Sequence, residues 1–468
     1  MSEKYDRLTV IHSKRFRRIT REHGALICKA MADSGTQGGV SMSRIALRFL
    51  KLIVFSALCW GVLFAGTASS VLAEHPLKLL HYWTGPLSGG IDEMVAEYNA
   101  RSPVSPIEAV GMDHESFKAG IKGLLASGQR PQLFSYWAGA RTQYMVDAGY
   151  LAPIDEAWNA AGLDRVFPHA VAETCVYNGK RYALPVTQHV VGFFFNRKLF
   201  SSLNITPPET WDEFIEVCRT LKRAGIAPLS LGNRERWPAQ FWFDYLLLRT
   251  AGPDYRDRLV KGKASYLDPQ VQHAFTLWQQ LIDEGFFSPA TGKNDWAGAA
   301  KEVHLGKAAM TLIGTWVMGY YGEQLGWKEM QDYDFFEFPL IDPGIRKSFV
   351  GPIDVLVVAR GNNGDIHGLD EALMYFARVR LQEVMSAGSG ALAPSGQVPL
   401  EFYGPLKRRL AEVVQRAELW NFAYDLAVPP AAADVGLGLF AAFLRQNQDL
   451  GMLLKSTQQR MEFIYGQH

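Results

Sequence analysis

Tryptophan side chains that follow predicted strands and turns are the residues of this sequence best suited to binding a small molecule. Trp83 and Thr84 follow one predicted strand, Trp137 follows another, and Trp316 follows a glycine-containing turn. Residues at the carboxyl edge of an α/β sheet face the crevice where such sheets bind ligands. Aromatic rings stack on apolar ligand faces, including the C–H face of a pyranose, and small-molecule pockets combine such rings with a few fixed polar groups. The competing interpretation is that these rings belong to a hydrophobic core.

Signatures of catalysis are absent from the sequence. No G-x-S-x-G elbow, H-E-x-x-H motif or glycine-rich phosphate loop occurs, and Gly388-Ser389-Gly390 lacks the spacing of a nucleophile elbow. A glycosidase needs two carboxylates beside the scissile bond, and the scattered Asp and Glu residues leave that alternative open. We expect a protein that is not an enzyme and that uses no cofactor and no metal.

Strand-like and helix-like patterns alternate along most of the chain. Leu77–Tyr82 and Gln132–Tyr136 are short apolar runs typical of strands, and apolar residues recur at helical spacing over residues 91–98. Such alternation predicts βαβ units and a mostly parallel sheet with both faces covered by helices. The chain after about residue 370 is almost entirely helical in pattern.

Two local signals are specific. Asn178-Gly179 between short apolar runs predicts a tight hairpin turn. Thr210 with Glu213 three residues later predicts a capping box at the start of a helix. The chain has no low-complexity linker, so if it forms two domains it passes between them more than once.

The N-terminal segment resembles an export signal. Arg44, Arg48 and Lys51 precede the apolar run Leu52–Phe64, and a small-residue tail ends at Ala73. This pattern predicts a Sec-type signal cleaved after Ala73, with Met42 as the expected start. Retention of residues 45–64 as a membrane anchor is the alternative. Cys59 follows Leu58 rather than a small residue, so we do not expect a lipoprotein.

Charge and cysteine content limit the function further. Residues 1–73 hold eleven of the 48 Lys and Arg residues but only four of the 47 Asp and Glu residues, so the remaining chain is mildly acidic. This argues against nucleic-acid binding, which depends on neutralising phosphates. Cys175 and Cys218 are the only cysteines after Ala73, and either one disulfide or two free thiols is compatible with export.

Four motifs in a fixed order resemble the family 1 extracellular solute-binding proteins of ABC importers, which include maltose- and glucose-binding proteins. They are His304–Met310 with Gly314-Thr315-Trp316, Asn178–Pro185, Phe195–Phe200 with Pro208–Phe214, and Ala227–Asn233. The similarity covers residues 77–468. It implies an α/β, two-lobed periplasmic-binding-protein fold with the ligand in the cleft between the lobes.

The same resemblance implies the division of the chain. We expect a first lobe of residues 74–186 and 338–383 and a second lobe of residues 187–337 and 384–468, after the N-terminal segment 1–73. The crossovers between lobes are expected near Pro185–Val190, Phe335–Leu340 and Glu383–Gly390.

The resemblance also supplies candidate ligand contacts. Trp316 matches the stacking tryptophan of the family and Trp137 aligns with a cleft position, whereas Gln188 and His189 lie where relatives carry a polar contact. Asp354 is expected at the cleft edge, where a buried carboxylate needs a partner such as a sugar hydroxyl or an arginine. The expected binding residues are Trp83, Thr84, Trp137, Gln188, His189, Asn233, Arg234, Trp237, Trp316 and Asp354. Arg234 and its neighbour Arg236 are equally compatible with ordinary solvated surface, and His189 with a structural role.

The implied function is capture of a sugar in the periplasm for the permease subunits of an ABC importer, by a protein expected to be a monomer. Residues 429–436 hold no stacking tryptophan, unlike many oligosaccharide-binding relatives, which favours a mono- or short oligosaccharide. A phosphorylated polyol or a peptide is the alternative ligand, because Arg234 and Arg236 suit an anion. A binder that serves a chemoreceptor rather than a transporter is also compatible with the sequence.

Overall fold

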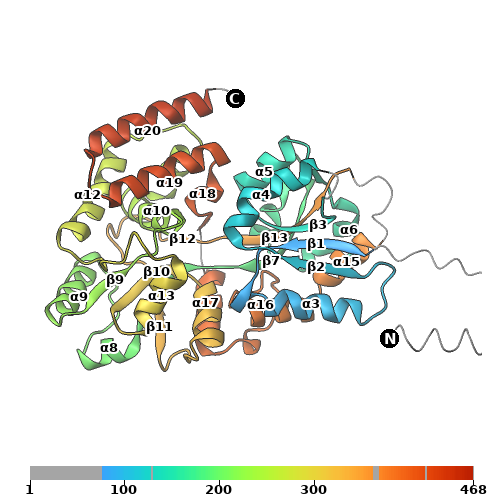
Figure 1. Ribbon diagram of the computed structural model, residues 1–468, viewed down its shortest axis with the longest axis horizontal. Coiled ribbons are helices and arrows are strands. Elements are labelled where there is room, and N and C mark those ends of the chain that lie inside the picture. Colours follow the sequence, from blue (N-terminus) through green and yellow to red (C-terminus); the bar gives the residue numbers. More distant parts are fainter. Residues whose placement is uncertain (1–75, 128–129, 362–367, 417–418, 467–468) are drawn as a thin grey trace, which may run out of the picture. The chain divides into compact units, whose positions relative to one another are not determined.

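Two β-sheets, each covered by helices, form the framework of the chain (Figure 1). The computed structural model describes residues 76–127, 130–361, 368–416 and 419–466. The predicted export signal and most of the polar turn after residue 360 lie outside these ranges. The part from Glu74 onward is a compact unit with a hydrophobic core of its own. Within the described ranges, every helix is too short or too polar to span a bilayer.

The first lobe is built on a six-stranded sheet in the order β2-β1-β3-β13-β4, with β7 also paired to β13. Its strands are β1 (Leu77–His81), β2 (Ile107–Gly111), β3 (Leu133–Trp137), β4 (Leu151–Ala152), β7 (Ala183–Gln188) and β13 (Ile353–Ala359). Its helices are α3 (Gly89–Asn99), α4 (His114–Ala126), α5 (Ala140–Asp147), α6 (Asp155–Ala160), α7 (His169–Glu173), α15 (Leu369–Phe376) and α16 (Val379–Ser389). Helices α3 and α16 lie on one side of the sheet, and α4 and α5 on the other (Figure 1).

The second lobe is built on a four-stranded sheet in the order β11-β8-β10-β9. Its strands are β8 (Val191–Asn196), β9 (Ala227–Ser230), β10 (Ala308–Gly314) and β11 (Tyr333–Phe336). Its helices are α8 (Arg197–Ser202), α9 (Trp211–Arg223), α10 (Gln240–Thr250), α11 (Gly252–Val260), α12 (Pro269–Asp283), α13 (Trp296–His304), α14 (Trp316–Gly319), α17 (Pro405–Arg416), α18 (Tyr424–Ala427), α19 (Pro430–Leu444) and α20 (Leu450–Tyr465). Two small strand pairs complete the fold, namely β5 (Val176–Tyr177) with β6 (Lys180–Arg181) and β12 (Phe349–Val350) with β14 (Trp420–Asn421).

The specific local signals of the sequence form as predicted. Asn178 and Gly179 both adopt positive φ, at 50° and 75°, and turn β5 into β6. At α9 the Thr210 hydroxyl accepts the Glu213 amide while the Glu213 carboxylate accepts the Thr210 amide. These contacts satisfy backbone donors that a helix N-terminus leaves unpaired.

The sheets are mixed, which corrects the prediction of a mostly parallel sheet. Strands β1, β2 and β3 are parallel, but β13 is antiparallel to β3, β4 and β7, and β8 is antiparallel to β10 and β11. The antiparallel strands are those next to the crossovers. Strands β8 and β13 each begin directly after a crossover from the other lobe. They therefore lack the helical connection that makes successive strands parallel.

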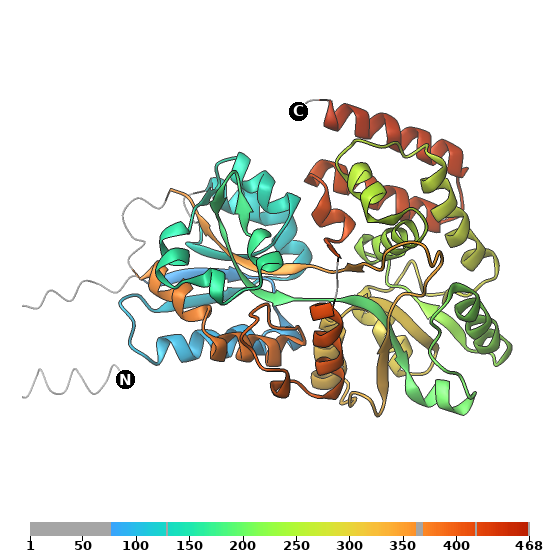
Figure 2. The same ribbon diagram turned by 180° about the vertical axis from the view of Figure 1, so that it is seen from behind.

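The first crossover lies at His189-Val190, where β7 continues into β8 (Figure 2). The second lies at Gly351-Pro352, later than the expected Phe335–Leu340, because Phe338 still packs in the second lobe with its ring stacked on Tyr245 at 4.9 Å. The expected third crossover covers the second half of α16, an uninterrupted helix that packs against α3. The boundary expected at residue 384 therefore falls inside α16, and the one expected at residue 338 falls at a ring that packs in the second lobe.

A buried ion pair between α10 and α11 fixes the segment before α18. Asp244 is fully buried, and its Oδ1 accepts Arg256 Nε at 2.9 Å while its Oδ2 accepts the Tyr424 amide at 2.8 Å. Arg256 also donates to the Phe422 carbonyl at 2.6 Å. Burial raises the pKa of the Asp244 carboxyl, and the Arg256 charge acts against that shift.

We expect Arg256→Met to lower the free energy of unfolding by about 3–5 kcal/mol, because the buried Asp244 carboxylate loses its counter-ion. Urea unfolding followed by far-UV circular dichroism measures this. The matched control is Arg380→Met, whose exposed pairs with Glu93 and Glu97 are worth less than about 1 kcal/mol. Equal losses in the two variants would show that burial adds nothing to the Arg256 pair.

Both cysteines are free and buried, which resolves the alternative between a disulfide and two thiols. Burial raises the pKa of the Cys175 thiol to about 12 and raises that of Cys218 well above its usual range. We therefore expect neither thiol of the folded 74–468 protein to react with a thiol reagent at pH 8, since the thiolate is the reactive form. Unfolding in guanidinium without reductant should release both thiols, and release of none would show a disulfide.

Candidate functional site

A cavity lies between the two lobes and is lined by residues of both. Its volume is about 210 Å³, far above the roughly 10–15 Å³ that one water molecule needs, so it has room for a ligand of many atoms. The residues lining it are Tyr82, Trp83, Thr84, Leu87, Asp113, His114, Lys118, Trp137, His189, Trp237, Gln240, Phe241, Trp296, Trp316, Pro352, Asp354, Ser389, Ala423, Asp425 and Leu426. In the described part of the chain, no group of three or more His, Cys, Asp or Glu is arranged to hold a metal ion.

The cavity brings together seven of the ten residues that the sequence singled out. They are Trp83, Thr84, Trp137, His189, Trp237, Trp316 and Asp354. Gln188, Asn233 and Arg234 are not among the lining residues. Gln188 exchanges two backbone hydrogen bonds with Leu392, both of 2.9 Å, and so serves to join β7 to the segment after α16. Contact of any of these residues with a ligand remains a prediction.

Trp316 and Trp296 present the most accessible indole rings of the cavity. Both are partly exposed, whereas Trp83, Trp137 and Trp237 are 2%, 6% and 9% exposed. Tyr82 already stacks on Trp137, with 4.5 Å between ring centres and 11° between ring planes. One face of the Trp137 ring is therefore occupied, and Trp316 and Trp296 are better placed to stack on a ligand.

The glycine before Trp316 explains how that ring is held. A Cβ atom at Gly314 would lie 1.9 Å from the Trp316 ring, so only glycine lets the indole fold back over the end of β10. The ring of His189 meets Trp316 edge-on at 5.3 Å, and Trp237 lies 5.8 Å from it. The conformation of the turn thus places Trp316 beside the first crossover, next to His189 and Trp237.

A series of polar contacts connects the two lobes through His189, which lies at the first crossover. Thr315 Oγ1 lies 2.9 Å from His189 Nδ1, and His189 Nε2 lies 3.3 Å from Asp354 Oδ2. The Thr187 hydroxyl donates to the same Asp354 oxygen at 2.6 Å. Thr187 and His189, rather than an arginine, therefore contact the buried Asp354 carboxylate. Its contact with a ligand hydroxyl stays a prediction. Burial, with the added charge of Asp354, raises the pKa of Tyr82 well above its usual range.

Arg234 does not line the cavity but contacts Asp295, the residue before the lining residue Trp296. Its guanidinium lies 2.5 Å from Asp295 Oδ2, and its amide donates to the Asn294 carbonyl at 3.0 Å. Asp295 in turn caps α13 by accepting the Gly298 amide at 2.7 Å. Trp296 is the first residue of that helix, so the loop after β9 fixes this ring. Asn233 lies in the same loop, and its Oδ1 has no hydrogen-bond partner among the described residues.

Sequence reasoning missed Trp296, Lys118 and Asp425. An aspartate before an apolar helical pattern is an N-cap signal, and it could have placed Trp296 at the start of α13. No local signal marks Lys118 or Asp425, which meet only in the folded chain.

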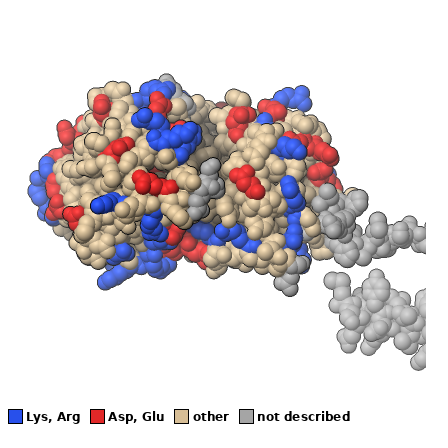
Figure 3. Space-filling view, turned by 90° about the horizontal axis from the view of Figure 1, so that it is seen from above, with Lys and Arg blue, Asp and Glu red and all other residues tan. Residues whose placement is uncertain are grey.

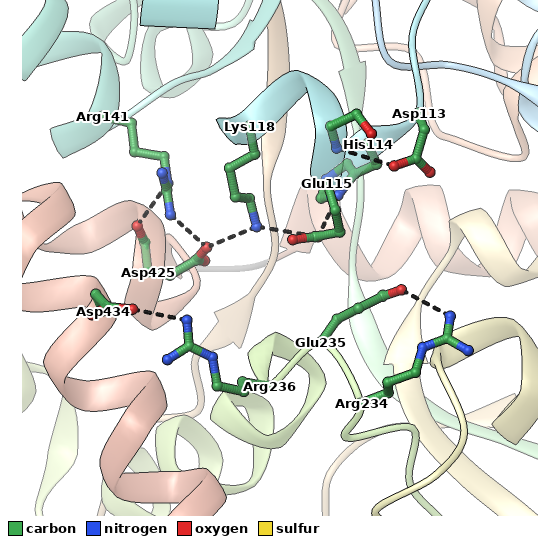
Figure 4. A network of polar contacts seen from close by, with 11 residues as sticks. Asp113, His114, Glu115, Lys118, Arg141, Arg234, Glu235, Arg236, Asp425 and Asp434 are labelled. Carbon is green, nitrogen blue, oxygen red and sulfur yellow. Dashed lines mark hydrogen bonds and ion pairs between the residues drawn. The ribbon is translucent and has the colours of Figure 1, made fainter. Parts of the chain in front are cut away.

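One end of the cavity is ionic (Figure 4). Lys118 Nζ lies 3.6 Å from Glu115 Oε1 and 3.9 Å from Asp425 Oδ2, and Arg141 contacts the same Asp425 oxygen at 3.1 Å. Partial burial alone would raise the pKa of Glu115, but the hydrogen bond with His114 and the charge of Lys118 outweigh it and lower that pKa to about 2. The Glu115 carboxyl is therefore ionised and lies beside the Lys118 cation.

Comparisons with known proteins agree on one family. A family model described as bacterial extracellular solute-binding protein matches residues 84–364. An uncharacterized ABC transporter extracellular-binding protein of Pyrococcus horikoshii is 24% identical over 83% of this chain and 89% of its own length. A probable sugar-binding periplasmic protein of Mesorhizobium japonicum is 26% identical over 58% of this chain and 64% of its own.

A solved structure extends the likeness to the fold. The bacterial solute receptor AcbH, which has an exclusive substrate preference for β-D-galactopyranose, superposes with a TM-score of 0.77. The superposition covers 84% of this chain and 100% of that one, at 22% sequence identity.

We expect Gly232→Ala to destabilise the loop that holds Trp296. A Cβ atom at Gly232 would lie 2.0 Å from the Asp295 carbonyl oxygen, so the two segments must separate. The expected loss is about 1–3 kcal/mol in the free energy of unfolding, as for other overpacked sites, measured by urea unfolding with tryptophan fluorescence.

The matched control for this substitution is Gly438→Ala in α19, where a Cβ atom meets nothing within 4 Å. Alanine is the better helix former there and should stabilise by about 0.5–1 kcal/mol. If Gly232→Ala behaved like Gly438→Ala, the close approach of the loop to Asp295 would be contradicted.

Proposed function

Since this chain belongs to the bacterial extracellular solute-binding protein family, we propose that it captures a neutral sugar between its lobes and delivers it to the permease subunits of an ABC importer. The observation that carries the proposal is the interlobe cavity, in which the partly exposed Trp316 and Trp296 lie beside fixed polar groups. Stacking on pyranose C–H faces together with a few oriented hydrogen bonds is a design suited to sugars. Relatives named as sugar-binding support the same ligand class.

The charges of the site favour a neutral ligand over a phosphorylated polyol. The arginines that suggested an anion are both paired with carboxylates, Arg234 with Asp295 and Arg236 with Asp434. The cavity lining itself carries Asp113, Asp354 and Asp425 against one lysine, Lys118. A phosphate brought into such a lining meets like charge, which weakens its binding.

The wall formed by the C-terminal segment favours a small ligand. Ala423, Asp425 and Leu426 supply this wall, and α19 follows with small side chains at its start. None of these residues offers an aromatic surface for a further sugar ring. The ligand we propose is therefore a monosaccharide or a short oligosaccharide.

The family and the predicted export signal support a proposal for where the protein works. We propose that the protein is exported to the periplasm through the signal ending at Ala73 and works there as a monomer, without enzymatic activity. On the face shown in Figure 3, basic and acidic side chains are interspersed, and neither sign forms a stripe of the kind that binds nucleic acid.

A thermal-shift panel of neutral sugars, amino sugars, sugar acids and phosphorylated polyols tests the proposal with the 74–468 protein. We expect a neutral sugar at a hundredfold excess over its Kd to stabilise the fold by about 2.7 kcal/mol. Trp316→Ala should abolish this ligand-induced shift because it removes the stacking surface.

Trp327→Ala is the matched control, because Trp327 packs on Tyr333 at 6.1 Å and does not line the cavity. It should change the melting temperature of the free protein and leave the ligand-induced shift intact. A shift with a phosphorylated polyol and with no neutral sugar would overturn the ligand class while leaving the fold assignment in place.

A further inference from the structure

An ion pair joins the two lobes at the ionic end of the cavity. We infer that Asp425 is an interlobe latch, whose carboxylate is presented by the second lobe and captured by Arg141 and Lys118 of the first. The latch draws the lobes together in the free protein and slows release of the ligand. The slower release of ligand rests on the proposed function, whereas the effect on the free protein does not.

Asp425 is fixed to the second lobe by its backbone. Its amide donates to Gln240 Oε1 at 2.7 Å, and the preceding amide, of Tyr424, donates to the buried Asp244. Both acceptors lie on α10. These bonds use none of the side-chain atoms of Asp425, so its carboxylate is free to reach the first lobe.

The first lobe meets this carboxylate with two cations. Arg141 on α5 donates through Nε to the Asp425 carbonyl and lies with its terminal nitrogen 3.1 Å from Oδ2. Lys118 on α4 lies 3.9 Å from the same oxygen. The side chains of Arg141 and Asp425 are only 10% and 7% exposed, so solvent and salt screen the pair weakly.

A glycine lets the backbones of the two lobes approach at this point. Gly139, two residues before Arg141, has φ of 106°, and a Cβ atom there would lie 2.5 Å from the Leu426 carbonyl oxygen. This contact is independent of the ion pair and lies beside it. The interlobe seam at α18 is therefore close-packed as well as charged.

The latch is also part of the cavity wall. Lys118, Asp425 and Leu426 line the cavity, and the cations of Lys118 and Arg141 lie 5.8 Å and 5.9 Å from the centre of the Trp137 ring. Opening the latch separates Asp425 and Leu426 from Trp137. Escape of a bound ligand through this end then requires the ion pair to break, which places the effect on koff.

Distances between spin labels in the ligand-free 74–468 protein test the latch without any sugar. Labels at Ala148→Cys and Ala431→Cys report on the two lobes, since both positions are exposed and the native cysteines are buried. We expect Arg141→Met and Asp425→Asn each to shift the distance distribution to longer values. The double variant should shift no further than the single ones, because the two side chains act as a unit.

The control is Arg219→Met, which removes an ion pair with Glu284 that lies wholly within the second lobe. It should leave the distribution unchanged. Identical distributions in wild-type and Arg141→Met protein, or additive shifts in the double variant, would overturn the latch.

Release kinetics with D-galactose as the probe sugar test the second effect. Arg141→Met should raise koff about 30-fold, as expected when one partner of a buried charge pair is removed. It should not lower kon, because the opening that releases a ligand through this end also admits one. A weaker affinity that arises from kon alone contradicts the latch. Failure of wild-type protein to bind D-galactose or any other neutral sugar counts against the proposed ligand class, whereas the label distances still decide on the latch.

Discussion

The arrangement of the site depends on the hydrogen bond that ties the two crossover segments together. The His189 amide donates to the Pro352 carbonyl at 3.0 Å, and a Cβ atom on Gly351 would lie 1.7 Å from the His189 carbonyl oxygen. Two of the passages of the chain between the lobes are therefore extended segments in direct backbone contact. The side chains at and after these segments, His189 and Asp354, are held at the cavity by the same contact.

Three of the residues that line the cavity are held by contacts with neighbours outside its lining or by their backbone. The Trp316 ring packs over Gly314, Trp296 is placed by the loop that carries Arg234, and the Asp425 amide is held by Gln240. Such supporting contacts decide whether a binding constellation keeps its geometry.

The sequence predicted the features whose causes are local. The Asn178-Gly179 turn and the Thr210–Glu213 capping box depend on residues within four positions of one another, and the strands before Trp83 and Trp137 are visible as apolar runs. The resemblance carried by the four family motifs predicted a ligand cleft between two lobes. Features that depend on distant partners escaped prediction, since Arg234 meets Asp295 61 positions away and Arg141 meets Asp425 284 positions away. The direction of β13 and the late second crossover escaped for the same reason.

The placement of the exposed indole rings makes the two lobes unequal in the order in which they meet a ligand. Trp316 and Trp296 both belong to the second lobe, and both are oriented by contacts within it or at the crossover. Under the proposed function, a sugar that docks first on this lobe meets two rings whose positions are already set by the protein. Under the same proposal, the second lobe then receives the ligand and the first lobe encloses it.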